Sequence, residues 1–346
     1  MIHGTKRWIG VCAVLALVAT GCHKPTFDQL KPTTVKWSVA VVAQAESQAQ
    51  QAEVQKLSED AAKVHAITSQ VDWVAPQDEV KTAARYAEKS TDLVMLTNGA
   101  ALGDLPQKNL RTRFAVVGDA SQPNSINERH LVPDQNQFYF LAGYLAAEAN
   151  KESAEPFSVL VANALPAGDQ RWKMIVAGAH YAGRYDVPVQ ILASELSATE
   201  SAANGTKQAV KPVGKPPVVK GRSLVLLTDL SDQAWAKIRT KNMHLIRTDG
   251  RTAPLAQQAN VLAQPKSLLA EALKEETELL QSGKWQGQQV ATLSAKHLYA
   301  VVNPQRVRDQ GLASRLELIE DSLTAGTIKP DDFVSSVVKN GSKAAR

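Results

Sequence analysis

One stretch in the middle of the chain limits its possible folds more than any other. The sequence DQNQFYFLAGYLAAEAN, residues 134–150, opens with Asp134 and Gln137 at the spacing of a capping box, and residues 138–147 carry no charge. A helix that is apolar on all sides cannot lie on a surface, so we expect this one to be buried. Gly143 in its middle costs roughly 1 kcal/mol against alanine. That cost indicates that another backbone approaches closely there, as in the core of an α/β domain.

Apolar strand-like runs and helix-like segments alternate on both sides of this central helix. Before it we expect strands at 37–43, 71–75, 92–96 and 114–117, with helices at 47–67 and from Pro76 onward. After it we expect strands at 157–162, 187–193, 223–227, 244–247, 260–263, 290–293 and 298–302, with helices at 169–185, 231–241, 267–282 and 304–323. This order is typical of parallel sheets covered by helices. The 346 residues suit two lobes better than one.

The first 22 residues have the character of a targeting segment. Lys6 and Arg7 supply the positive charge, and the apolar run at residues 8–19 is too short to span a bilayer comfortably. The run ends in VATGC, which resembles the lipobox of bacterial lipoproteins and predicts cleavage and lipidation (palmitate included) at Cys22. An ordinary secretory leader with an accidental cysteine is the alternative. We therefore expect a lipid-anchored protein on the extracytoplasmic face of the cell membrane.

Cysteine usage agrees with lipidation. The chain has only Cys12 and Cys22, and Cys12 would leave with the leader. The exported protein would then have no thiol for a disulfide, a metal site or nucleophilic catalysis. Residues 23–36, with two prolines and few apolar side chains, are expected to act as a tether.

Several functional classes find no support in the sequence. The balance of 39 basic and 34 acidic residues is only mildly positive, and no basic stripe suggests nucleic acid. The seven histidines are isolated, and there is no H-E-x-x-H, G-x-S-x-G, P-loop or G-x-G-x-x-G after a strand. We expect no catalytic residue, no metal and no cofactor. Residues 203–222 are rich in Pro and Lys and are expected to form an exposed loop.

The central helix also carries a family resemblance. FYFLAGYLAAEAN, residues 138–150, is similar to the FLAGYLAA segment of the basic-membrane-protein family of lipoproteins, the nucleoside-binding proteins of bacterial ABC importers. Other segments follow in the family's order, and they are DLVMLTNG (92–99), FAVVGD (114–119), VAGAHYAG (176–183), LIRTDG (245–250), QPKSLLAEAL (264–273), SGKWQG (282–287) and TAGTIKPDDF (324–333). The resemblance covers almost the whole chain after the leader.

The resemblance implies a type I periplasmic-binding-protein fold, in which two Rossmann-like lobes with parallel sheets are joined by three crossovers. The expected crossovers lie near 119–127, near 249–253 and after Leu293. The expected domains are a first lobe at 37–125 and 250–293, a second lobe at 126–249 and 294–330, and a frayed tail at 331–346.

The resemblance also supplies candidate ligand-binding residues. Asp249 stands at a strand end and matches the family position that binds ribose, and Lys266 matches a lysine that the family places at the pocket. Asn98 and Asp119 end two further strands, although both residue types are ordinary in turns. Trp172 could stack a base or belong to the core.

Other segments depart from the family's pattern. At three positions where the family has turns rich in glycine or aromatic residues, this chain has other residues. The three segments are Ala43–Ser47, Asn98–Ala101 and Asn163–Pro166. Surfaces for stacking and for amide contacts are therefore reduced, and the fold carries over better than the nucleoside does.

Two functions follow from this reasoning. The first is a solute-binding lipoprotein that holds a small polar ligand between its lobes, with a nucleoside as the candidate class, and delivers it to an ABC permease. The second is a Med-like regulatory or accessory lipoprotein of the same fold with a degenerate ligand site.

Overall fold

The structure is a computed structural model that describes residues 36–44, 48–64, 67–97, 102–197, 219–228, 243–248, 260–293, 298–303, 305 and 311–334. All of its helices and strands lie in the compact unit Trp37–Arg346, which is distinct from the unit Met1–Lys36. The predictions for Cys22, the tether, Asn98, Asp249, the helix at 231–241 and most of the basic loop fall outside the described residues.

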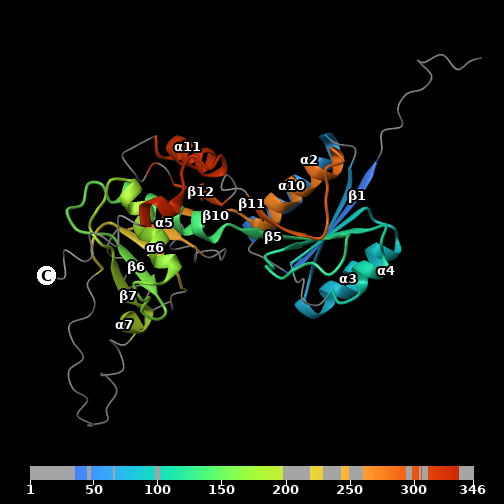
Figure 1. Cartoon of the computed structure of the whole chain (residues 1–346), viewed down its shortest axis with the longest axis horizontal. Coiled ribbons are helices and arrows are strands. Elements are labelled where there is room, and N and C mark those ends of the chain that lie inside the picture. Colours follow the sequence, from blue (N-terminus) through green and yellow to red (C-terminus); the bar gives the residue numbers. More distant parts are fainter. Residues whose placement is uncertain are drawn as a thin grey trace, which may run out of the picture. The chain divides into compact units, whose positions relative to one another are not determined.

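The first sheet has six strands in the order β11-β5-β4-β3-β1-β2, and all of its pairings are parallel (Figure 1). The strands are β1 (Trp37–Gln44), β2 (Ile67–Val74), β3 (Leu93–Leu96), β4 (Arg113–Val117), β5 (Glu128–Pro133) and β11 (Gln289–Leu293). Strands β1, β3 and β4 are rich in Val, Leu and Ala and are almost wholly buried, as expected for parallel strands covered on both faces.

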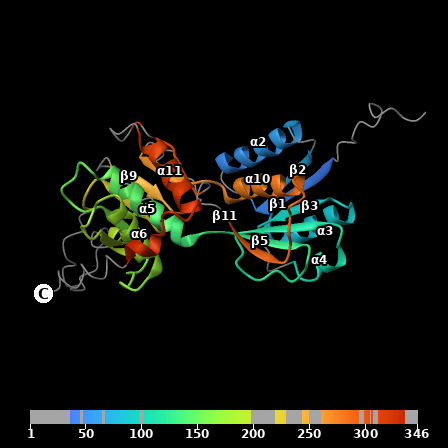
Figure 2. The ribbon, with the colours of Figure 1, turned by 45° about the horizontal axis from the view of Figure 1, so that its top comes forward.

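Helices cover both faces of this sheet. Helices α2 (Gln48–Val64) and α10 (Leu268–Gln281) lie side by side on one face, where their apolar residues join Val39, Val41 and Ala43 in one core cluster (Figure 2). The other face packs against α3 (Glu79–Glu88) and α4 (Leu105–Lys108), and the short helix η2 (Pro76–Asp78) precedes α3. We call this part of the chain the first lobe.

The second sheet repeats the same plan, with the order β12-β10-β9-β8-β6-β7. Its strands are β6 (Ser158–Val161), β7 (Val189–Leu192), β8 (Ser223–Leu226), β9 (His244–Arg247), β10 (Val261–Pro265) and β12 (Tyr299–Val301). Only β12 runs antiparallel to its neighbour. The helices of this second lobe are α5 (Gln135–Ala149), α6 (Gln170–Tyr181), α7 (Ala193–Ser197) and α11 (Leu312–Thr324).

The chain passes between the two sheets three times, as expected for the type I fold. Strand β5 leads into α5, which packs on α6, β8 and β9; β10 leads into α10, which packs on α2; and β11 is followed by β12. The third passage lies after Leu293, as predicted.

The first two predicted passages were placed wrongly. Residues 128–133 belong to the first sheet and residues 261–265 to the second, so the lobes divide at 133–135 and at 265–268 instead of at 125 and 249. Strand β5 was missed because Glu128, Arg129 and His130 look like a surface loop. All three are buried, and their charges have partners: His130 lies 2.8 Å from Glu128, and Arg129 lies 2.9 Å from Glu276.

The central helix is buried as the sequence predicted, with Asp134 accepting from the amide of Gln137 at 3.0 Å. A Cβ atom built at Gly143 would overlap the carbonyl of Ile175 and lie 2.8 Å from its Cα. A Cβ atom at Gly178 of α6 would in turn lie 2.8 Å from the amide nitrogen of Tyr144. The close backbone approach expected at Gly143 is therefore confirmed, with α6 as the partner.

The chain remains ordered into the segment predicted to be a frayed tail. Residues 331–334 are helical, and the Phe333 ring lies 5.3 Å from that of Tyr181 and 6.1 Å from that of Phe140. The prediction was wrong up to residue 334, because the polar residues around Phe333 concealed its contact with the core.

Candidate ligand-binding site

In open parallel sheets, ligands bind outside the carboxyl ends of the strands. In the first lobe this edge carries Thr97 after β3 and Asp119 after β4. In the second lobe it carries residues 162–169 after β6 and Lys266 after β10.

A buried carboxylate fixes the turn after β3. Glu79, the first residue of α3, is fully buried and accepts hydrogen bonds from the Thr97 amide and, at 2.8 Å, from the Thr97 hydroxyl. The amide of Gln44 at the end of β1 donates to the same hydroxyl at 3.4 Å. Glu79 therefore holds the end of β3 through Thr97, whose hydroxyl also contacts the end of β1.

Asp119 is held by its own loop. Its carboxylate accepts from the Ser121 amide at 2.8 Å. Burial works to raise the pKa of Asp119, but the hydrogen bonds from Ser121 and the charge of His130 outweigh it and lower the pKa below its ordinary value. Asp119 is therefore an ionised acceptor at neutral pH.

A chain of hydrogen bonds continues from this loop into β5. The Ser121 hydroxyl lies 3.3 Å from Nδ1 of His130, whose Nε2 lies 2.8 Å from Oε1 of Glu128. The order Ser–His–acid is that of a hydrolase triad. However, the Ser121 amide is already given to Asp119, whose negative charge would oppose an oxyanion beside Ser121. The arrangement is better suited to fixing the loop at 118–127.

The second lobe presents two helix starts capped by aspartates. Asp134 caps α5, and Asp169 caps α6 by accepting from the Arg171 amide at 2.9 Å. Asp169 also receives the Arg171 guanidinium at 2.8 and 3.1 Å. This pairing leaves the site with no net charge from the two side chains.

Amide and aromatic groups complete this edge. The side-chain amide of Gln170 donates to that of Asn136 at 3.2 Å, which joins the starts of α6 and α5. Tyr139 lies near the same pair of charges. Burial raises the pKa of its hydroxyl, while Arg171 opposes and Asp169 adds to that effect. Planar amides, a paired guanidinium and an aromatic ring form a surface suited to a neutral polar ligand.

The predicted site residues have different outcomes. Lys266 lies at the start of α10, where its charge acts on Glu53 of α2; burial and Glu271 raise the pKa of Glu53, and Lys266 lowers it. Trp172 is only 8% exposed and belongs to the core of the second lobe, so the prediction of a stacking role was wrong. The sequence reasoning missed Asn136, Tyr139, Gln170 and Arg171, although the two aspartate caps marked the helix starts that carry them.

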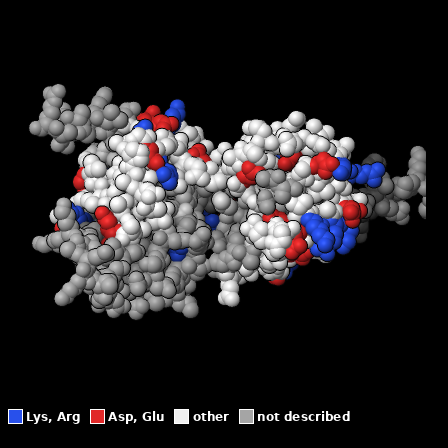
Figure 3. Space-filling model, turned by 90° about the horizontal axis from the view of Figure 1, so that it is seen from below, with Lys and Arg blue, Asp and Glu red and all other residues white. Residues whose placement is uncertain are grey.

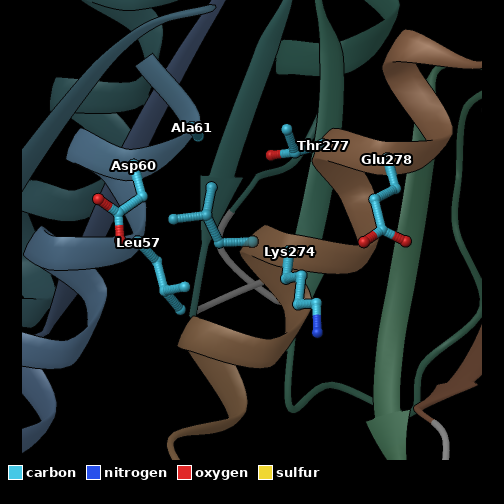
Figure 4. Close-up of a pocket in the computed structure, with 7 residues that line it drawn as sticks. Leu57, Asp60, Ala61, Lys274, Thr277 and Glu278 are labelled. Atoms are coloured by element: carbon cyan, nitrogen blue, oxygen red, sulfur yellow. The ribbon is translucent and has the colours of Figure 1, made fainter. Parts of the chain in front are cut away.

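A groove between α2 and α10 lies apart from these edges. It has a volume of about 190 Å³ and is lined by apolar atoms of Leu57, Ala61 and Leu273, with Asp60, Lys274, Thr277 and Glu278 around them. Figure 4 shows that the charged ends of Lys274 and Glu278 lie away from α2. Pockets for small-molecule ligands usually measure about 300 to 1,000 Å³, so this groove is too small for a nucleoside.

Neither a metal cluster nor a membrane span occurs in the part of the chain that the structure describes. No group of three or more His, Cys, Asp or Glu side chains among these residues could hold a metal ion. Among the same residues, no helix is both long enough and apolar enough to cross a bilayer.

Known proteins resemble this chain in structure and not in sequence. No model of a protein family matches it, and no curated protein does. A solute-binding protein of an ABC transporter system from Conexibacter woesei aligns over 85% of this chain and 98% of its own, with a TM-score of 0.59 and 16% identity. A transcriptional activator of the comK gene from Bacillus halodurans aligns over 85% and 99%, with a TM-score of 0.53 and 12% identity. An ABC solute-binding protein from Aeropyrum pernix covers 87% and 90%, with a TM-score of 0.50 and 12% identity. The chain therefore has the two-lobed α/β fold of type I periplasmic binding proteins.

Proposed function

We propose that this protein is a solute-binding protein that holds a small, neutral, polar ligand between the carboxyl edges of its two sheets. The observation that carries the proposal is the topology. The two sheets have corresponding strand orders, and the chain crosses from one sheet to the other three times. Such a connection provides strands about which two lobes can close by a hinge motion. The polar groups at both carboxyl edges would supply the contacts.

The paired charges of the second lobe favour a ligand without a net charge. Arg171 is neutralised by Asp169, and the ionised Asp119 of the first lobe can accept hydrogen bonds from hydroxyl groups. The amides of Asn136 and Gln170 and the ring of Tyr139 suit hydroxyl-rich compounds. Nucleosides and neutral sugars are the classes to test, and catalysis is not part of the proposal.

The proposal includes an address and a partner. The lipobox-like VATGC at residues 18–22 supports a lipid anchor at Cys22 and a place on the extracytoplasmic face of the membrane. Two structural neighbours are solute-binding proteins of ABC transporter systems, which supports an ABC permease as the recipient of the ligand.

Thermal unfolding in the presence of a panel of nucleosides and neutral sugars tests the proposal. A ligand at 100 times its dissociation constant should add about 2.7 kcal/mol to the free energy of unfolding. The variant Arg171→Ala should weaken that gain for the active compound. Its matched control is Arg222→Ala, because Arg222 also pairs with an acidic neighbour, Glu152 at 3.0 Å, but lies away from the site. Equal losses in both variants would contradict the assigned site.

The second candidate is a regulatory or accessory lipoprotein of the same fold. The likeness to the activator of the comK gene favours it, as do the departures from the family's glycine-rich turns. Absence of any thermal shift across the panel would support this candidate over the first.

A further inference from the structure

The amino edge of the first sheet, opposite the candidate ligand site, carries a second cluster of side chains. Strands β1, β4, β5 and β11 run parallel, so their first residues lie along one edge. There the Arg113 guanidinium lies 5.5 Å from the centre of the Trp37 ring and 5.7 Å from that of Trp285. The two indoles therefore hold one cation between them.

Two large apolar side chains next to this cluster are exposed to solvent. Leu110 is 63% exposed and Ile126 is 67% exposed. Their loops are connected, because the side-chain amide of Asn127 donates to the backbone carbonyls of Asn109 at 3.0 Å and Thr112 at 2.6 Å. The backbone of Ile126 also closely approaches Gly287, two residues after Trp285. Leu110, Ile126 and Trp285 are thus held near one another by a rigid frame.

Exposed basic residues lie at this edge. Arg111 and Lys284 are exposed, next in sequence to Leu110 and Trp285. Among the acidic groups nearby, Asp104 pairs with Lys108, and Glu275 and Glu276 both contact Arg129. Asp92 accepts from the Ser38 hydroxyl at 2.7 Å, which leaves its charge in place. Glu88 at the end of α3 is exposed but stands next to the exposed Lys89. Figure 3 shows basic side chains gathered at the right-hand end of the part that contains the first sheet.

We propose that this edge, defined by Leu110, Arg111, Ile126, Lys284 and Trp285, binds the surface of an anionic lipid membrane. Lysine and arginine around exposed leucine and isoleucine, with a partly buried tryptophan beside them, are the composition of an interfacial site. The basic residues attract the negative headgroups, and the apolar residues can enter the boundary between headgroups and acyl chains. The segment that precedes the fold also joins it here, because Trp37 is the first residue of β1. The carboxyl edge of the same sheet would then point away from the lipid.

Binding to vesicles without the lipid anchor tests this proposal and does not depend on ligand binding. A chain that begins at residue 23 keeps the whole compact unit Trp37–Arg346 but lacks the leader and Cys22. It is sedimented with vesicles of phosphatidylglycerol and phosphatidylcholine in equal parts, and with vesicles of phosphatidylcholine alone. We expect binding to the anionic vesicles only, weakening as salt is added.

Three double variants locate the binding surface. Each basic residue near an anionic surface contributes about 1 kcal/mol, so Arg111→Glu with Lys284→Glu should weaken binding at least about thirtyfold. Leu110→Ser with Ile126→Ser should weaken it about tenfold or more. The control joins Leu318→Ser, at a residue that is 65% exposed in the second lobe, with Lys329→Glu, and should leave binding unchanged. Equal binding to both kinds of vesicle, or a control that loses as much as the first variant, would overturn the proposal.

Discussion

Each lobe covers one face of its sheet with a pair of neighbouring helices, and the two pairs are packed differently. In the second lobe, α5 and α6 meet backbone to backbone at Gly143 and Gly178, where a Cβ atom on either helix would overlap the other. In the first lobe, α2 and α10 leave a groove of about 190 Å³ between them. The α5–α6 pair is in backbone contact at these two glycines, and the α2–α10 pair is separated by side chains at the groove.

The difference shows which part of this fold is strictly specified by its residues. The α5–α6 pair depends on two glycines that nothing else can replace without moving a backbone. The α2–α10 pair depends on ordinary apolar contacts. The buried ion pair of Arg129 and Glu276, to which partly buried Trp285 donates a hydrogen bond, holds the second half of α10. Tolerance to substitution should therefore differ sharply between the two pairs.

The largest effect is expected from Gly143→Ala. A gain of roughly 1 kcal/mol in helix propensity cannot offset an overlap with the Ile175 carbonyl, so we expect a net loss of about 3 kcal/mol or more, or failure to fold. Chemical denaturation of the chain from residue 23 measures it. Gly168→Ala is the control, because a Cβ atom there meets nothing within 4 Å. Similar stability of the two variants would show that α5 and α6 are not locked together.

The second effect concerns the buried end of α10 and depends on pH. Burial raises the pKa of Glu276 to about 7, against the lowering effects of Arg129 and Trp285. Because the folded pKa lies above the unfolded value of about 4.5, the folded state holds the proton more firmly. This stabilisation is complete below about pH 4.5 and is lost as the pH rises through about 7.

Glu276→Gln removes that titration. Relative to the variant, the unsubstituted protein should lose stability on the order of 3 kcal/mol between about pH 4.5 and pH 8. Urea denaturation of both proteins across this range gives the difference directly. A difference that stays constant with pH would mean that Glu276 does not titrate with a raised pKa.

A smaller effect is expected at the outer side of the α5–α6 pair. Phe333 packs on Phe140 and Tyr181 and is only partly buried, so Phe333→Ala should cost about 2 kcal/mol. Truncation of the chain after residue 330 should cost at least as much. An unchanged denaturation midpoint in both variants would show that residues 331–334 do not stabilise the fold.

The smallest effect is expected from filling the groove in the first lobe. Ala61→Leu would place apolar atoms against Leu57 and Leu273, and we expect a gain of about 0.5 to 1 kcal/mol. The same added side chain in the second lobe, at Ala142 of the α5–α6 pair, should be destabilising because Ala142 is fully buried. A gain of stability at Ala61 and a loss at Ala142 would confirm that the two helix pairs are packed differently. Changes in the same direction at both positions would contradict it.

Sequence reasoning reached the fold more securely than the site. The uncharged run from Phe138 and the apolar strands predicted the sheets, and Gly143 predicted the close packing of the central helix. Strand β5 was not predicted, because its charged residues are neutralised by partners that are distant in sequence, such as Glu275 and Glu276 for Arg129.

The site was harder to predict, because it depends on which polar residues the helix starts bring together. Asn136 and Gln170 are 34 residues apart in the sequence, and no local pattern connects them. Trp172 illustrates the opposite error, since a residue near a helix start can still point into the core.

The central claim is that two lobes joined by three passages close on a solute, and a distance between the lobes tests it most directly. The chain from residue 23 contains no cysteine, so Lys56→Cys in the first lobe and Lys329→Cys in the second, both exposed, can carry spin labels. The distance is measured by pulsed electron resonance with and without the nucleoside or sugar that stabilises the protein most. The account predicts a shift of the whole distribution to a new distance when that compound binds. An unchanged distribution in the presence of a compound that binds and stabilises the protein would contradict it.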